Sequence, residues 1–192
     1  GTAVRLVLES VPEDVAYFID AAAGPGGDGD PGVDSPAHRA VLAARGEDLL
    51  NALPDAPFDE RSGWGLLNPV DEGDGFVGAK ALVPGVYDKG RSTGWWASAG
   101  ASVDYRLTLP AGEWELVSGY REWWGQTREI APSVAVGEEV VAGDPVRLSS
   151  ASPDGRSTIR FALDEEATVR FSAARGEGAA DPVLSWLAVA PV

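Results

Sequence analysis

Residue types that carry much of enzyme chemistry are absent or scarce in this sequence. It has no cysteine, no methionine and a single histidine, His38. Disulfides, thiolate nucleophiles and zinc–sulfur sites are therefore excluded, as is a mechanism that needs several histidines. Without a second histidine to share a metal, His38 is expected to be an ordinary surface residue. No G-x-S-x-G, P-loop or dinucleotide-binding motif occurs either.

Long apolar runs are also absent, and the balance of charge is one-sided. No stretch approaches the ~20 apolar residues of a membrane-spanning helix. The first residues, Gly1-Thr2-Ala3-Val4, lack the basic and apolar regions of a signal peptide. We expect one domain, residues 1–192, taken from a longer multidomain protein. The formal charge of −15 predicts no binding of nucleic acid and no insertion into a membrane.

The pattern of apolar residues is typical of short strands. Val4–Glu9 alternates, Val15–Asp20 is apolar on both faces and is expected to be central, and Val183–Val189 reads the same way. Val103–Leu109 and Trp114–Val117, joined by Pro110-Ala111-Gly112, predict an antiparallel hairpin. One short helix is expected over Pro36–Arg45, because Ser35-Pro36 is a typical helix start and Gly46 a stop.

Two stretches show no regular pattern. Gly24–Gly32 is too rich in glycine and proline for a helix or strand, and residues 54–102 form a long turn-rich region. The whole predicts an all-β, antiparallel β-sandwich of the jelly-roll kind, with one short helix and a long irregular loop region.

Tryptophan is unusually frequent, with seven residues in the chain. Alternation assigns Trp114 and Trp186 to the core, and Trp64 is expected to join them. Two neighbouring indoles in an extended backbone point to opposite faces, so one member of Trp123-Trp124 and one of Trp95-Trp96 should lie outside or in a cleft.

The charged neighbours of Trp123-Trp124 complete a pattern suited to sugar recognition. An indole can cover the C–H face of a pyranose, while carboxylate and guanidinium groups hold its hydroxyls. The alternative is that both indoles fill the end of the sandwich while an arginine pairs with Glu122. The predicted ligand-binding residues are Trp123, Trp124, Trp95, Trp96, Glu122, Arg121 and Arg128.

Carboxylates also cluster in the glycine-rich loop. Asp28, Asp30 and Asp34 offer hard oxygen ligands at a spacing that suits calcium, although the segment does not match an EF-hand. A structural calcium ion is therefore the one metal we expect, with a solvated turn as the alternative. Asp71-Glu72-Gly73-Asp74 is a second cluster of the same kind.

Four segments resemble one family in their order along the chain. Tyr17–Ala22 resembles the first core strand of the malectin-like branch of the galactose-binding-like β-sandwiches, and Asp104–Leu116 resembles its central hairpin. Gly119–Arg128 is similar to the following strand with its acidic residue and later arginine, and Asp181–Val189 to its closing strand. Similar segments occur as accessory modules of large secreted bacterial glycosidases, which implies a polysaccharide or oligosaccharide ligand.

The resemblance and the tryptophan pairs together favour a non-catalytic carbohydrate-binding module of a secreted, extracellular bacterial enzyme that degrades polysaccharides. Such a module acts by tethering its enzyme to the substrate. A structural β-sandwich that packs on a neighbouring catalytic domain without binding sugar is the main alternative. A stand-alone hydrolase using paired carboxylates is the third.

Overall fold

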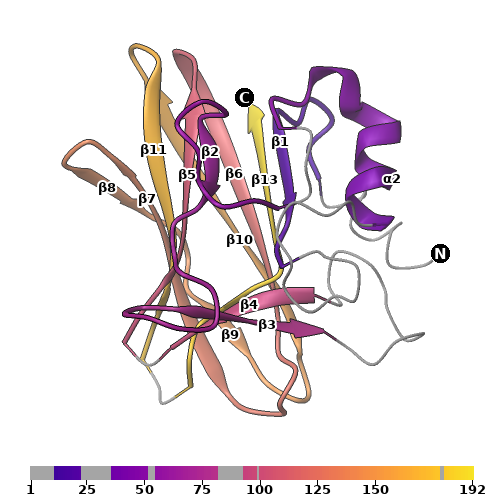
Figure 1. The fold of residues 1–192 in the computed structure, drawn as a ribbon, viewed down its shortest axis with the longest axis vertical. Helices are drawn as coiled ribbons and strands as arrows, with labels where there is room; N and C mark the ends of the chain where they lie inside the picture. The colour runs from indigo at the N-terminus through magenta and orange to yellow at the C-terminus, as the bar shows by residue number, and fades with distance from the viewer. Residues whose placement is uncertain (1–10, 23–35, 52–54, 82–92, 99, 178–179) are drawn as a thin grey trace.

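The computed structural model describes residues 11–22, 36–51, 55–81, 93–98, 100–177 and 180–192. Within them it contains one α-helix, one 3-10 helix and thirteen strands (Figure 1). The predicted strand Val4–Glu9 and the glycine-rich loop lie outside the described residues. In the described part of the chain, no helix is long and apolar enough to cross a membrane.

Two antiparallel sheets form the sandwich, and the expected all-β fold is confirmed. The first sheet has the order β1-β13-β6-β10. Its strands are β1 (Tyr17–Asp20), β13 (Trp186–Pro191), β6 (Gly112–Arg121) and β10 (Asp154–Leu163). The second has the order β2-β5-β11-β7-β8, with β9 also paired to β7. Its strands are β2 (Trp64–Leu66), β5 (Val103–Leu109), β11 (Ala167–Arg175), β7 (Arg128–Val136), β8 (Glu139–Ala142) and β9 (Val146–Leu148).

A third, smaller sheet of order β12-β4-β3 lies across one end of the sandwich (Figure 1). Its strands are β12 (Val183–Leu184), β4 (Thr93–Ala97) and β3 (Val77–Ala81). β3 and β4 lie within residues 54–102, which are expected to be irregular. β12 lies within Val183–Val189, which is predicted as one strand. The expectation that residues 54–102 are irregular is therefore wrong for β2, β3 and β4. These strands are short and contain Gly65, Gly78 and Gly94, which hide the alternation of apolar side chains.

The predicted hairpin between Val103–Leu109 and Trp114–Val117 is also wrong. Both strands exist, but β5 pairs with β2 and β11 while β6 pairs with β10 and β13. The turn at Pro110–Gly112 therefore carries the chain from one sheet to the other. A short turn between two alternating strands is compatible with either arrangement, and only the partners of each strand decide between them.

The helix α2 (Pro36–Arg45) has the predicted bounds and is followed by a 3-10 turn, η1 (Gly46–Asp48). It covers the outer face of the first sheet, where Val41 and His38 pack with Phe18 and Trp186. The expectation that His38 is a surface residue is wrong, because its side chain is fully buried there.

Cover on both faces explains the continuous apolar character of β1 and β13. β13 is central, between β1 and β6, as predicted. β1, predicted to be central, ends the order of its sheet among the described strands, and it owes its burial to α2 rather than to a second neighbour. The main core between the two large sheets includes Trp64 and Trp114, and Trp186 lies under the helix, so all three assignments to the interior are confirmed.

Candidate functional site

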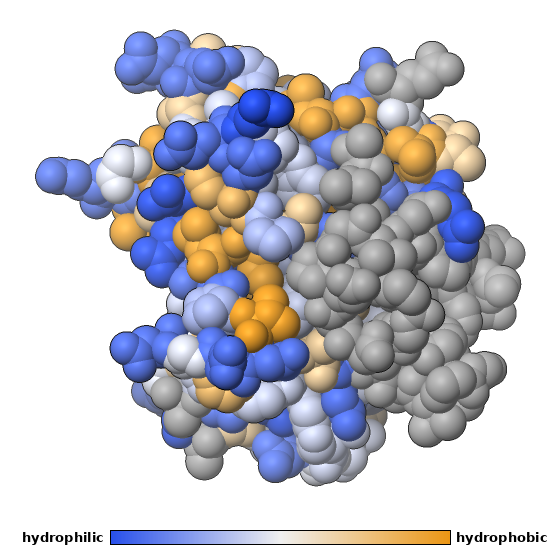
Figure 2. Space-filling model, in the orientation of Figure 1, coloured by the Kyte–Doolittle hydropathy of each residue, from blue (hydrophilic) through white to orange (hydrophobic). Residues whose placement is uncertain are grey.

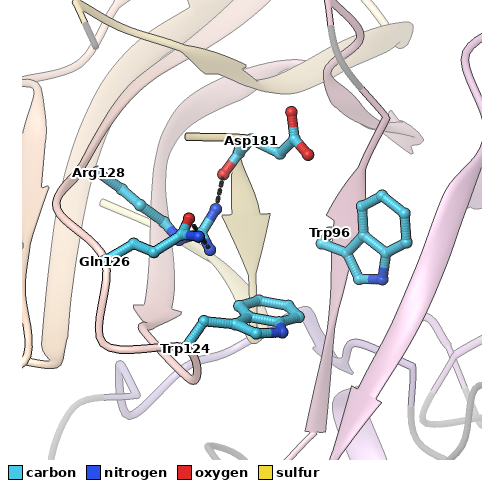
Figure 3. A pocket seen from close by; sticks show the side chains of 5 residues that line it. All are labelled: Trp96, Trp124, Gln126, Arg128 and Asp181. Atoms are coloured by element: carbon cyan, nitrogen blue, oxygen red, sulfur yellow. Dashed lines mark hydrogen bonds between the residues drawn. The ribbon is translucent and has the colours of Figure 1, made fainter. Parts of the chain in front are cut away.

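A pocket of about 230 Å³ lies where the loop between β6 and β7 meets β4 and the segment before β12 (Figure 3). Its lining residues come from three separate parts of the chain: Trp96, Trp124, Gln126, Arg128 and Asp181. Figure 3 shows the two indoles on adjacent sides, with the Gln126 and Arg128 side chains between Trp124 and Asp181. The pocket therefore combines two aromatic surfaces with amide, guanidinium and carboxylate groups.

The strand β4 sends its two tryptophans in different directions. Trp95 points into the core and is fully buried, whereas Trp96 is only partly buried and lines the pocket. Trp96 lies on Gly78 of β3, where a Cβ atom would come within 2.5 Å of its indole. Phe76 meets it edge-on, with ring centroids 5.5 Å apart. A glycine on the neighbouring strand thus makes the room that holds this indole in place.

Glu122 organises the loop that carries Trp124. Its Oε1 accepts the backbone N–H groups of Trp124, at 2.5 Å, and of Gln126, at 3.2 Å, while its Oε2 pairs with Arg128 Nε. The Glu122 side chain is fully buried. Both of its oxygens serve the protein, so the prediction that Glu122 holds sugar hydroxyls is wrong. It shapes the loop instead.

Arg128 is held at several points. Its Nε pairs with Glu122, its Nη1 donates to the Asp181 carbonyl, and its Nη2 donates to Gln126 Oε1 at 3.1 Å. These bonds use three of the five N–H donors of a guanidinium. The side chain lines the pocket although it is almost entirely buried. The remaining two donors are thereby presented from a fixed position.

Trp124 is the exposed aromatic residue of the site, with 41% of its surface accessible. The Arg128 Cζ lies 4.8 Å from its ring centroid and the Lys80 Nζ lies 5.2 Å away. Trp123 meets it edge-on, with centroids 5.9 Å apart. Trp123 is itself half-buried and packs over Gly94, where a Cβ atom would come within 2.3 Å of its ring. It supports Trp124 from behind, so the expectation that one indole of this pair faces outward is confirmed.

Two of the predicted ligand-binding residues lie away from the pocket. Trp95 is inaccessible to a ligand, because its Nε1 donates to Asp55 Oδ2 at 2.8 Å and to Tyr105 Oη at 2.9 Å inside the core. Arg121 pairs with Asp154 at 3.1 Å and does not line the pocket. The predictions for both are wrong as contact residues. Trp124, Trp96 and Arg128 are brought together.

Three side chains at the pocket were not predicted from the sequence: Gln126, Asp181 and Lys80. Gln126 could have been found, since it lies between Trp124 and Arg128 in one loop. Asp181 lies 53 positions after Arg128, and Lys80 lies 48 positions before Arg128. No local pattern in the sequence marks either residue. Only the pairing of β12 with β4 and of β3 with β4 brings them in.

A buried carboxylate lies directly behind β4. Asp55 Oδ2 accepts hydrogen bonds from Ala22 N at 2.7 Å, from Trp95 Nε1 and from Tyr105 Oη, and Oδ1 accepts the Ala56 N–H. Burial raises the pKa of Asp55 to about 6, although these hydrogen bonds oppose the rise. Burial, and then the nearby Asp55 charge, raise the pKa of Tyr105 well above its ordinary value. Asp55 therefore fixes Trp95, and with it the strand that presents Trp96.

The predicted calcium ligands Asp28, Asp30 and Asp34 lie outside the described residues, so the calcium site stays a prediction. The second acidic cluster, Asp71, Glu72 and Asp74, forms an exposed turn. Among the residues that have been placed, no group of three or more histidine, aspartate or glutamate side chains could hold a metal ion.

No known protein family and no curated protein matches the sequence. Similar solved structures exist. A β-glucuronidase 2 from Bacteroides uniformis has a TM-score of 0.50 and 16% identity over 92% of this chain and 18% of that one. The ANX2 ectodomain from Arabidopsis thaliana has a TM-score of 0.52 and 8% identity over 91% of this chain and 49% of that one. The CBM22-1 xylan-binding domain from Paenibacillus barcinonensis has a TM-score of 0.47 and 10% identity over 68% and 86%.

These identities establish the fold alone. The chain spans less than a fifth of the β-glucuronidase and about half of the plant ectodomain. The strand order, the two facing sheets and the similarities to the β-glucuronidase and the plant ectodomain show a β-sandwich fold. A β-sandwich is the fold that the resemblance of its segments implied.

Proposed function

We propose that this domain is a carbohydrate-binding module and that its ligand binds between Trp96 and Trp124. The observation that carries the proposal is the pairing of an exposed indole with fixed polar groups in one pocket. The C–H face of a sugar ring packs against an aromatic face, and hydroxyls take hydrogen bonds from the polar groups around it. The pocket supplies donors from Arg128, an acceptor from Asp181 and both from Gln126.

The size of the pocket sets the scale of the ligand. Its volume of about 230 Å³ is below the ~300 Å³ at which pockets for drug-sized ligands begin. A single sugar ring or the end of a chain is therefore the expected occupant. The pocket is also rigid, because Glu122 holds the loop and Gly78 holds Trp96. A pre-formed pocket loses less entropy on binding.

The proposed role is binding rather than catalysis. Glycoside hydrolysis usually needs two carboxyl groups on either side of the bond. Among the described residues that line the pocket, Asp181 carries the only carboxylate, and the nearby Glu122 is buried against Arg128. We further propose that the domain belongs to a longer, secreted bacterial enzyme that degrades polysaccharides. The match to part of a β-glucuronidase chain supports this arrangement.

Calorimetry against a panel of oligosaccharides, with Trp124→Ala and Trp96→Ala alongside, tests the proposal. We expect binding by the wild type and a loss of about tenfold or more in each variant, since an aromatic contact contributes on the order of 1 kcal/mol beyond the area it buries. Val140→Ala, which trims an exposed apolar side chain on β8, is the matched control and should bind normally. Binding that survives both tryptophan substitutions would place the sugar elsewhere.

The exposed Trp124 also suits contact with a neighbouring domain. In that case, no glycan in the panel would bind, and the isolated domain would instead bind its catalytic partner through Trp124. Hydrolysis products in the same samples would favour an enzyme. Each of these results would contradict the binding module proposed here.

A further inference from the structure

Two arginines face each other on the outer surface of the second sheet. Arg106 of β5 is directly opposite Arg170 of β11, and both side chains are exposed. Directly opposed residues on neighbouring strands have Cβ atoms only ~5 Å apart, and like charges in this position destabilise a sheet. The opposed pair therefore costs the sheet stability unless other contacts offset the repulsion.

The two guanidinium groups are held in different ways. Arg170 Nη2 donates to Asp104 Oδ2 at 2.7 Å, and Asp104 is in turn fixed by Ser102 Oγ at 2.9 Å. Arg106 lies over the ring of Phe58, with its Cζ 5.4 Å from the centroid. Among the described residues, no carboxylate pairs with Arg106. Its N–H donors are therefore free for an acceptor from outside.

Both arginines line a groove of about 520 Å³, larger than the tryptophan pocket. Phe58, Glu60 and Gly63 lie on the β2 side of it, and Ala135 and Gly137 on the β7 side. The hydroxyls of Thr108 and Thr168, 2.9 Å apart, lie two positions along the same strands from the arginines. In Figure 1, β7 and β8 lie to the left of β11 and β2 lies to its right. Figure 2 shows the hydropathy of the molecule in the same orientation.

The formal charges around the groove balance. The positive charges of Arg106 and Arg170 are matched by the negative charges of Asp104 and Glu60. The chain as a whole, by contrast, has a formal charge of −15. Asp104 is mostly buried beneath Arg170, and Glu60 is exposed on the rim. A single carboxylate from a ligand would thus meet guanidinium donors, with one rim carboxylate opposing it.

We infer that this groove is a second binding site and that it takes an acidic oligosaccharide, with a uronate carboxylate between Arg106 and Arg170. The inference rests on the proposed function only in taking sugar as the ligand class. Guanidinium groups bind carboxylates through paired, charge-assisted hydrogen bonds. The threonine hydroxyls and the open, small-residue floor suit the hydroxyls of an extended sugar chain. An acidic peptide would also supply a carboxylate, but it lacks the many hydroxyl groups that the two threonines could bind.

Titration of the isotope-labelled domain with trigalacturonate, followed by amide NMR shifts, locates and measures the binding. Its fully methyl-esterified form is the neutral probe. We expect shifts at residues 106, 108 and 170 with the acid only, and weaker binding as salt rises. Arg106→Gln should weaken binding by about tenfold, and Glu60→Gln should strengthen it. Arg156→Gln makes the same charge change on exposed β10 and should leave binding unaltered.

Several results would overturn the inference. Equal shifts with the methyl ester would exclude a carboxylate contact, and equal affinity for tetraglutamate would indicate a general anion site rather than a sugar site. Arg106→Gln with normal affinity, given an unaltered Tm, would remove the proposed contact. Loss of trigalacturonate binding in Trp124→Ala but not in Arg106→Gln would put the acid in the tryptophan pocket.

The two proposals can fail separately. Trigalacturonate bound in the tryptophan pocket would leave the proposed function standing and contradict the groove site. Trigalacturonate bound in the groove, with no glycan bound between Trp96 and Trp124, would support the groove site and contradict the proposed pocket.

Discussion

At the scale of single residues, the pocket depends on buried carboxylates that are not among its lining residues. Glu122 fixes the loop of Trp124 through two backbone N–H groups, and Asp55 fixes Trp95 behind Trp96. Neither role is visible in the sequence, where both residues look like ordinary acids among 30. Their importance follows from burial, which makes an unsatisfied or unpaired polar group costly.

Glu122→Gln should destabilise the domain strongly. It leaves the Arg128 charge buried without its partner, which typically costs about 3–5 kcal/mol of unfolding free energy. Denaturant unfolding measures the loss. The matched control is Glu115→Gln, which breaks the more exposed pair with Arg160 and should cost about 1 kcal/mol or less. Similar losses in the two variants would show that the Glu122–Arg128 pair is not buried in solution.

Asp55 should make stability depend on pH. Its pKa is raised from 3.8 to about 6 in the folded state, so the folded protein binds this proton more tightly than the unfolded chain does. The contribution is present below pH 3.8 and is lost as pH rises through about 6, a fall of about 3 kcal/mol. The difference in unfolding free energy between wild type and Asp55→Asn should carry this slope. A flat difference for Asp55→Asn would contradict the assignment.

At the scale of elements, the small sheet β12-β4-β3 positions the pocket. Gly78 and Gly94 let the indoles of Trp96 and Trp123 approach it closely, and added Cβ atoms there would come within 2.5 Å and 2.3 Å of the rings. The strands of this sheet are short, so its main contribution is to position aromatic side chains at the pocket. Its geometry is therefore best tested by mutations that displace those side chains.

Gly78→Ala should move the Trp96 ring and weaken ligand binding while leaving the sandwich folded. Overpacking of this kind typically costs about 1–3 kcal/mol, measured by thermal unfolding and by the Kd for the sugar. Combining it with Trp96→Ala supplies the control. The added methyl group then meets open space, so the stability cost of Gly78→Ala should largely vanish in that background. Simple additivity of the two changes would mean that Trp96 does not lie on Gly78.

Local sequence signals were sufficient wherever neighbours in the chain decide the structure. The start and stop residues of α2 and the apolar run of β13 placed both elements. Those signals failed where tertiary partners decide, as in the assignment of β5 and β6 to opposite sheets and in the burial of His38 under α2. For the site, the aromatic pairs identified Trp124 and Trp96, but alternation could not say which indole of each pair faces outward. Asp181 and Lys80 could be placed at the pocket only from the fold, because strand pairing brings them there.

At the scale of the whole molecule, the excess of acid should lower stability by self-repulsion. The formal charge is −15 and the isoelectric point about 4.3, so the folded chain concentrates negative charge at neutral pH. We expect the Tm at pH 7 to rise by a few degrees as sodium chloride screens these charges. The same titration near pH 4.3 is the control and should have little effect. A Tm that falls with salt at pH 7 would mean that ion pairs dominate instead.

The pairing of β1 with β13 has a consequence for synthesis on the ribosome. Tyr17 lies opposite Val189, and Arg128 at the pocket reaches the carbonyl of Asp181. The partner of β1 is therefore synthesised only after almost all of the domain has been translated. The pocket is completed at the same late stage, because it needs Asp181. A nascent chain stopped before Asp181 would expose the apolar faces of β1 and β6, so this domain should complete its fold only after β13 has left the ribosome.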